Sequence, residues 1–219
     1  IDRAGLVGED GPTHHGAFDI AYLRCLPNAV VMSPKDEYEL QSMLLTSIEY
    51  PGPAALRFCR GSGLGVELQD KVKSIPIGES ELLREGRDVL LIALGPMVPL
   101  ALEASSQLEE IGIQASVLNL RFVKPMDKKK ILEQANLCKR IVTIEEGTKI
   151  GGMGSGVLEI LSENKMSNIP VSVLGIPDRF ISHGSPALQR EDCGLTSGDI
   201  TQAARDLIDI DDHMRSVIS

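Results

Sequence analysis

The sequence predicts an α/β fold of two three-layer units, each a mostly parallel sheet with helices on both faces. Three observations support this prediction. Short apolar runs alternate along the chain with segments whose apolar residues recur at helical spacing. The run VLLIAL at 89–94 has no polar alternation, as expected of a strand that is buried on both faces. Proline and glycine stand at most of the boundaries between segments.

The first unit is expected at residues 1–62. A strand at 29–32 leads into a helix with Ser33 as its N-cap and Pro34 as its first residue. The PGP stretch at 51–53 ends this helix, and a second strand covers 54–58. The helix is expected to bury one apolar face, formed by Leu40, Met43, Leu44 and Ile48. A weakly patterned, glycine-containing surface linker follows at 63–78.

The second unit is expected at residues 79–219, with a cleaner alternation of strands and helices. Its predicted strands are 89–94, 115–120, 141–144 and 171–176. Its predicted helices run from Val98 to the stop at Gly112, over 127–138, over 157–165 and from about Ser197 onward. The last helix is expected to bury Ile200, Ala203, Ala204 and Leu207.

The composition argues against several partners. A net charge of −9 and a pI of about 5.0 disfavour nucleic acid and anionic membranes, since both require a basic face. The four cysteines lie far apart without metal-type spacing, which predicts free thiols and a reducing compartment. No apolar run is long enough to span a bilayer and no signal peptide is recognisable, so the chain is not expected to be secreted.

The stretch GEDGPTHHGAFD at 8–19 is the first candidate for chemistry. Its glycines and proline predict a tight loop that holds Asp10 and His14 at fixed positions. Histidine titrates near neutrality and can exchange a proton with a reacting oxygen. A surface turn with solvated histidines is the alternative. A metal site is not expected, because His14 and His15 are sequence neighbours without a third ligand.

Arginines are the second candidates, since a guanidinium group can bind two oxygens of a phosphate at once. Arg57 and Arg60 flank the end of a predicted strand, and Arg3 lies near the start of the chain. Arg60 is favoured over Arg57, because ligands of α/β proteins bind at the carboxyl ends of strands. The alternative for each arginine is a surface ion pair.

Other motifs favour structural roles. GGMGSG at 151–156 follows a strand and opens a helix, and close packing or a subunit contact is a better interpretation than an anion site. Glu145 and Glu146 are expected to cap that loop. His183 is expected to be a satisfied loop histidine, and the lysines at 128–130 a solvated first turn of a helix.

Taken in order, several motifs resemble one enzyme family over nearly the whole chain. DRAGLVG at 2–8 precedes the GEDGPTHHGAFD loop, and the later motifs are SPKDE at 33–37, LRFVKPMD at 120–127, EEG at 145–147 and GIPD at 175–178. Together they resemble the 1-deoxy-D-xylulose-5-phosphate synthases, thiamine-diphosphate enzymes of the transketolase type. GEDGPTH alone would also fit transketolases.

The resemblance implies part of a transketolase pyrimidine-binding domain followed by a transketolase C-terminal domain. The domain that holds the cofactor diphosphate and Mg²⁺ is expected before residue 1, so no cofactor or metal ligand is assigned and the chain alone is expected to be inactive. The implied reaction transfers a two-carbon unit from pyruvate, with loss of CO₂, to D-glyceraldehyde 3-phosphate, and starts the methylerythritol phosphate route to isoprenoids. A homodimer in a bacterial cytoplasm or a plastid stroma is implied as well.

The resemblance also implies residue roles. His14 would hydrogen-bond or protonate the reacting oxygen, and Asp10 would position the intermediate or the histidine. Arg3 and Arg60 would hold the substrate phosphate. The chain has Cys59 where the family has proline before the second arginine, which relaxes the backbone there. Transketolase, a pyruvate dehydrogenase beta subunit and a non-catalytic dimerisation module are the alternative functions.

Overall fold

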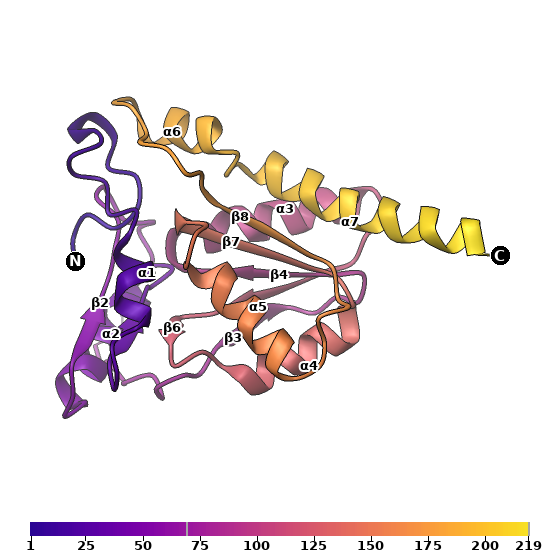
Figure 1. Cartoon of the computed structure of the whole chain (residues 1–219). Coiled ribbons are helices and arrows are strands. Elements are labelled where there is room, and N and C mark those ends of the chain that lie inside the picture. The colour runs from indigo at the N-terminus through magenta and orange to yellow at the C-terminus, as the bar shows by residue number, and fades with distance from the viewer. Residues whose placement is uncertain (69, 219) are drawn as a thin grey trace.

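The computed structural model of the chain describes residues 1–68 and 70–218. Gln69 of the predicted linker and Ser219 of the predicted second unit lie outside the described residues. Figure 1 shows a central sheet covered by helices, with a smaller layer of strands and helices along one side.

The central sheet has five strands. In spatial order these are β3 (Glu81–Arg84), β5 (Ala115–Asn119), β4 (Val89–Ala93), β7 (Ile141–Thr148) and β8 (Val171–Ile176). β4 pairs in parallel with β5 and β7, β7 pairs in parallel with β8, and only the edge strand β3 is antiparallel. Every residue of β4 is buried, as its uninterrupted apolar run predicts.

Helices cover both faces of this sheet. α3 (Val98–Glu110) and α7 (Ser197–Ile218) pack on one face, and α4 (Lys128–Cys138) and α5 (Met153–Glu163) pack on the other. Alternate residues of β4 point to opposite faces, so Leu91 joins the first core and Ile92 the second. α7 buries Ile200, Ala204 and Leu207 as predicted, with Ala203 partly buried beside them. The predicted α/β class is thereby confirmed.

The smaller sheet has three strands. β1 (Val30–Met32) lies between β2 (Ala54–Leu56), which is parallel to it, and β6 (Phe122–Lys124), which is antiparallel. α1 (Asp19–Arg24) and α2 (Glu37–Glu49) pack against these strands. Since β6 comes from the second half of the chain, the second unit completes the sheet of the first.

The start of α2 differs from the prediction. Asp36, with an extended backbone, is the N-cap, and its carboxylate accepts a hydrogen bond from the Glu39 N–H at 2.8 Å. Ser33 and Pro34 therefore precede the helix and do not start it. Asp36 is the N-cap in place of Ser33 because its short carboxylate reaches the free N–H of the residue three positions later, as N-cap side chains do.

The buried face of α2 was also predicted wrongly. Leu44 and Ile48 are 52% and 71% exposed, whereas Met43 is fully buried. The helix buries Glu39 and Thr46 together with Met43. These two polar residues turn inward because they find partners on distant segments of the chain, and that gain outweighs the apolar pattern of the helix.

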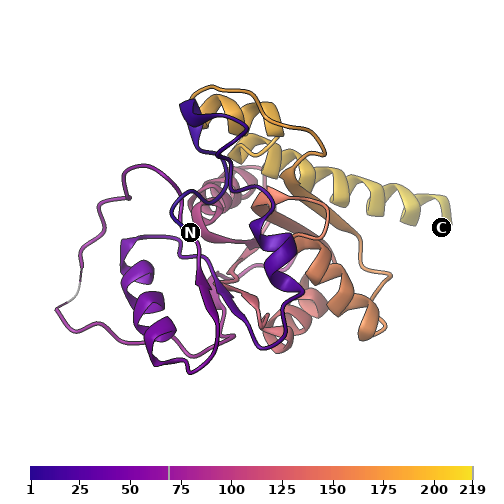
Figure 2. The same cartoon turned by 60° about the vertical axis from the view of Figure 1, so that its left-hand side comes forward.

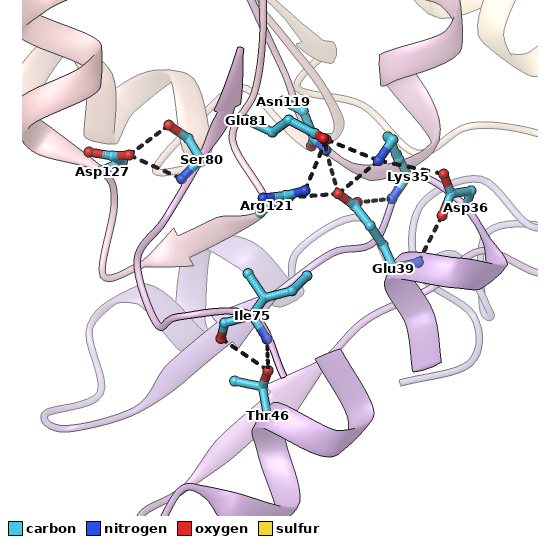
Figure 3. Close-up of polar contacts among 10 residues, drawn as sticks. All are labelled: Lys35, Asp36, Glu39, Thr46, Ile75, Ser80, Glu81, Asn119, Arg121 and Asp127. Carbon is cyan, nitrogen blue, oxygen red and sulfur yellow. Dashed lines mark hydrogen bonds and ion pairs between the residues drawn. The ribbon is translucent and has the colours of Figure 1, made fainter. Parts of the chain in front are cut away.

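Glu39 is the centre of a polar network that joins the two halves of the chain (Figure 3). Its Oε1 accepts hydrogen bonds from Arg121 Nε at 2.7 Å, from Asn119 Nδ2 at 2.8 Å and from Lys35 Nζ at 3.0 Å. Glu81 lies 3.0 Å from both cations. The two cations, Lys35 and Arg121, offset the charge of the Glu39 carboxylate, which allows Glu39 to be buried.

The remaining segments are short. The described residues of 63–78 form no helix or strand. The Thr46 hydroxyl of α2 donates a hydrogen bond to Ile75 O and accepts one from the Ile75 N–H (Figure 3). A 3₁₀ turn at Gly95–Met97 precedes α3. The helix α6 (Pro186–Cys193) was not among the predicted elements, and the Ser185 hydroxyl caps it.

Candidate active site

The GEDGPTHHGAFD segment forms a tight loop at the edge between the two units. Gly8 and Gly11 have φ angles of +71° and +72°, and a 3₁₀ turn spans Gly8–Asp10. The Gly11 N–H donates to Gly8 O at 3.2 Å, and the His14 N–H donates to Gly11 O at 3.0 Å. L-residues rarely adopt such φ angles, so glycine at these positions shapes the loop.

Three of the four predicted site residues lie together. Arg3 Nη1 contacts Asp10 Oδ2, and Arg60 Nε lies 3.5 Å from the same oxygen. Arg60 Nη1 also donates to Val7 O at 3.0 Å. All three side chains are partly exposed. The group combines two guanidinium charges with one carboxylate, so it retains one positive charge and can attract an anion.

His14 lies apart from this charged group. Its side chain is exposed, and its Nδ1 is 2.9 Å from the Thr13 hydroxyl. Among the described residues no hydrogen bond links His14 to Asp10. The ring is therefore accessible to a ligand. The Thr13 hydroxyl contacts the ring where the sequence suggested Asp10 as a partner.

His15, the neighbour of His14, points into the protein. Its Nδ1 accepts a hydrogen bond from the Val7 N–H at 3.0 Å, and its Nε2 lies 3.2 Å from Ile181 O. This arrangement fits a neutral ring protonated on Nε2. Burial lowers the pKa of His15, and the nearby His183 adds to that effect. His15 thus holds the loop in place and is not free for proton transfer.

Arg57 is a structural residue. It is 1% exposed, and its Nε donates to Asp19 Oδ2 at 2.9 Å. Its Nη2 donates to Glu146 O at 3.2 Å. These bonds hold together the end of β2, the start of α1 and the strand β7. With its guanidinium buried and paired, Arg57 is not accessible to a phosphate.

Cys59, which stands where the family has proline, does not prevent Arg60 from joining Arg3 and Asp10. Its side chain lines a cavity of about 280 Å³ together with Phe58, Leu64 and Pro96, among other residues. Cys59 is exposed as a whole, and partial desolvation of its thiol raises the pKa of that group. Arg60, the next residue, still reaches both Val7 O and Asp10.

The two glutamates before GGMGSG are buried in β7, which runs four residues further than predicted. Glu145 accepts hydrogen bonds from the N–H groups of Met153 at 2.8 Å and Gly154 at 2.9 Å, and so caps α5. A Cβ atom at Gly152 or Gly154 would collide with residues of β7 and its neighbour. The glycines thus allow close helix–strand packing, as predicted.

Burial raises the pKa of Glu145 to about 7, although its two N–H donors and nearby arginines oppose the shift. Because the folded state holds this proton more tightly than the unfolded chain, the stabilising contribution is present below about pH 4.5 and is lost as the pH rises to about 7. We expect this loss to reach about 3 kcal/mol and to be absent in Glu145→Gln. Urea unfolding of both proteins across this pH range measures it, and identical pH profiles would contradict it.

The described residues contain no group of three or more His, Cys, Asp or Glu side chains that could hold a metal ion. Nor does any helix in the described part of the chain have the length and hydropathy of a membrane span.

Two protein families match the chain. The transketolase pyrimidine-binding domain matches residues 1–63, and the transketolase C-terminal domain matches residues 78–200. Relatives named 1-deoxy-D-xylulose-5-phosphate synthase include those of Heliobacterium modesticaldum, 51% identical over 217 residues, and Halothermothrix orenii, 47% identical over 209 residues. These alignments cover 99% and 95% of this chain but 33% of each relative, so the chain spans about a third of their length.

A solved structure is similar as well. It is named split gene transketolase, inactive beta4 tetramer, and it matches with a TM-score of 0.84 and 35% identity. The match covers 94% of this chain and 65% of that chain.

Proposed function

Since the chain belongs to the transketolase family through its pyrimidine-binding and C-terminal domains, we propose that it supplies these two domains to a 1-deoxy-D-xylulose-5-phosphate synthase. The domains are placed at residues 1–62 and 79–219, with a linker at 63–78. The observation that carries the proposal is 51% identity to a synthase over 99% of the chain. The convergence of Asp10, Arg3 and Arg60 beside the loop of His14 supports it.

The proposed reaction joins pyruvate to D-glyceraldehyde 3-phosphate with loss of CO₂, as the first step of the methylerythritol phosphate route to isoprenoids. Thiamine diphosphate, held with Mg²⁺ by another domain, would supply the carbanion chemistry when bound. In this chain, Arg3 and Arg60 bind the substrate phosphate, His14 gives or takes a proton at the reacting oxygen, and Asp10 positions the reacting groups.

The pairing of both arginines with Asp10 suggests how the substrate is received. Without substrate, the carboxylate partly neutralises the two guanidinium groups. A phosphate carries more charge and more acceptor oxygens than one carboxylate, and it matches the guanidinium fork. Phosphate binding would therefore draw Arg3 and Arg60 away from Asp10 and leave the carboxylate free for its positioning role.

Arg60→Ala in the complete enzyme is expected to raise the KM for D-glyceraldehyde 3-phosphate by about 10- to 100-fold, because a charge-assisted contact contributes about 1.5–3 kcal/mol. The KM for pyruvate should stay near the wild-type value. Steady-state kinetics with each substrate varied in turn measure both constants. Arg87→Ala, at an exposed arginine before β4, is the matched control. An equal rise in both KM values would remove Arg60 from the phosphate site.

The direct test is an assay of the complete enzyme with thiamine diphosphate, Mg²⁺ and both substrates. Formation of 1-deoxy-D-xylulose 5-phosphate is the expected result, and transfer from a ketose phosphate donor or to a lipoyl domain would reject the proposal in favour of the other thiamine enzymes. The isolated chain is expected to bind no cofactor and to form no product. Turnover by this chain alone would show that the active site is complete within it.

A second candidate is a separate subunit that acts with another chain. The similarity to a structure named split gene transketolase, inactive beta4 tetramer, favours it, because a chain of this fold forms an assembly there without activity. Mixing the chain with a separately produced partner domain would distinguish the two candidates, since only a natural subunit should regain activity on mixing.

The proposed homodimer has a suitable surface in this chain. Phe18, Tyr22 and Phe180 are 50%, 58% and 75% exposed, and the rings of Phe18 and Phe180 meet edge to face at 6.3 Å. Exposed aromatic groups of this kind mark contact surfaces. If a second copy covers them, Phe180→Asp should shift the enzyme from dimer to monomer in sedimentation velocity, and an unchanged dimer would place the contact elsewhere.

A further inference from the structure

We infer that Gln189 of α6 is a positioning residue for the catalytic loop, so that the C-terminal domain holds the backbone that carries Asp10 and His14. This inference rests on the proposed function for its catalytic consequence. Figure 2 shows the loop at the start of the chain lying directly beside α6. The two segments are about 180 residues apart in sequence, as the contact between Gly8 and Gln189 shows.

Gln189 binds both backbone polar groups of one loop residue, Gly8. Its Oε1 accepts a hydrogen bond from the Gly8 N–H at 2.9 Å, and its Nε2 donates to Gly8 O at 2.9 Å. Nε2 also donates to Ser182 O at 2.9 Å. The residue is 3% exposed, and its two bonds to Gly8 are buried. A side chain that both donates to and accepts from one residue fixes that residue in position and in orientation.

Further contacts hold the same loop against the segment that leads into α6. His15 joins Val7 N–H to Ile181 O across its ring. The imidazole of His183 lies so close to Gly11 that a Cβ atom there would collide with it. Gly8 is similarly restricted, because a Cβ atom would be pressed against Pro186. Gly8 and His15 are thus hydrogen-bonded to the C-terminal domain, and Gly11 lies close against it.

The consequence for catalysis follows from the position of Gly8. This glycine begins the 3₁₀ turn that ends in Asp10, and its carbonyl accepts the N–H of Gly11. Any movement of Gly8 therefore moves Asp10 and the segment up to His14. Displacement of a catalytic group by about 1 Å can cost about 100-fold in rate.

The test compares two buried glutamines in the complete enzyme. Gln189→Met removes the contacts to Gly8 while keeping the size of the side chain. Gln134→Met is the matched control, because Gln134 is 4% exposed and accepts a hydrogen bond from Ser116, away from the loop. We expect amide hydrogen exchange in residues 5–16 to rise by about 10-fold or more in Gln189→Met only. We expect its kcat to fall by about 10- to 100-fold, with the KM for pyruvate near wild type.

Unchanged exchange and unchanged kcat in Gln189→Met would overturn the inference, and so would equal loop exchange in the two variants. Gln189→Glu provides a second variant if Gln189→Met does not fold. It keeps an acceptor for the Gly8 N–H but loses the donor to Gly8 O and Ser182 O, so it should loosen the loop as well. The exchange measurement needs no turnover, so an enzyme without synthase activity would reject the proposed function and still test the positioning role.

Discussion

His14→Ala in the complete enzyme is expected to lower kcat by about 10²- to 10⁴-fold, the range that loss of a general acid–base group produces. The free energy of unfolding should change by no more than about 0.5 kcal/mol, because surface side chains contribute little to stability. His14 is exposed, and the only hydrogen-bond partner of its side chain among the described residues is the Thr13 hydroxyl. Single-turnover kinetics together with urea unfolding measure both quantities.

The neighbouring histidine provides a sharp comparison. His15→Ala should lower the stability of the loop, because the Val7 N–H and Ile181 O then lose their partner. Glu9→Ala, at an exposed residue of the same loop, should leave both kcat and stability near wild type. Turnover of His14→Ala at the wild-type rate would remove His14 from the mechanism, whatever the behaviour of the other two variants.

Arg57→Met is expected to cost about 3–5 kcal/mol of stability, the usual loss when one partner of a buried ion pair is removed. The substitution leaves the carboxylate of Asp19 buried at 3% exposure and without its cation. It also removes the donor to Glu146 O. Among the substitutions proposed for this chain, we expect Arg57→Met to lower the free energy of unfolding most. The loss is a large part of the about 5–15 kcal/mol by which domains are stable.

Denaturant unfolding of the chain measures the loss, and a pair on the surface provides the control. Lys128 and Glu163 form an ion pair of 3.3 Å, with side chains 50% and 68% exposed. Lys128→Met should therefore cost less than about 1 kcal/mol. A similarly small cost for Arg57→Met would mean that water reaches Asp19. In the double variant with Asp19→Asn, part of the loss should be recovered, because no charge remains buried.

Short-range signals predicted the central sheet well. The apolar run at 89–94 forms β4, and the segment 171–176 forms β8 with the predicted bounds. Asp127, just after Pro125, accepts the Lys130 N–H at 3.0 Å and starts α4. Such features depend on side chains within a few residues of one another, so a single stretch of sequence contains the information.

The buried face of α2 was predicted wrongly because it depends on contacts with residues far away in the sequence. Its apolar spacing favoured burial of Leu44 and Ile48, but the structure exposes both. Glu39 is buried instead because Asn119 and Arg121 approach it from more than 70 residues away. The short strand β3 was missed for a related reason, since it exists only through antiparallel pairing with β5.

The candidate site shows the same division. Gly11, Pro12 and Gly16 predicted a tight loop, and a tight loop with a 3₁₀ turn at Gly8–Asp10 is present. The sequence contained no signal for Gln189, which lies in an unpredicted helix, or for the inward turn of His15. Periodicity cannot distinguish a buried polar side chain from a solvated one, because the difference depends on partners elsewhere in the chain.

By itself, the sequence determined the alternation of strands and helices, the two-sided burial of the central strands and the shape of the loop that carries His14. Only the tertiary structure decided that Arg3, Asp10 and Arg60 meet, that Arg57 is buried with Asp19, and that α6 holds the loop. The physical reason is the range of the interactions. Backbone preferences and apolar periodicity act between near neighbours, whereas ion pairs and buried hydrogen bonds form only after folding has brought distant residues within about 3 Å of one another.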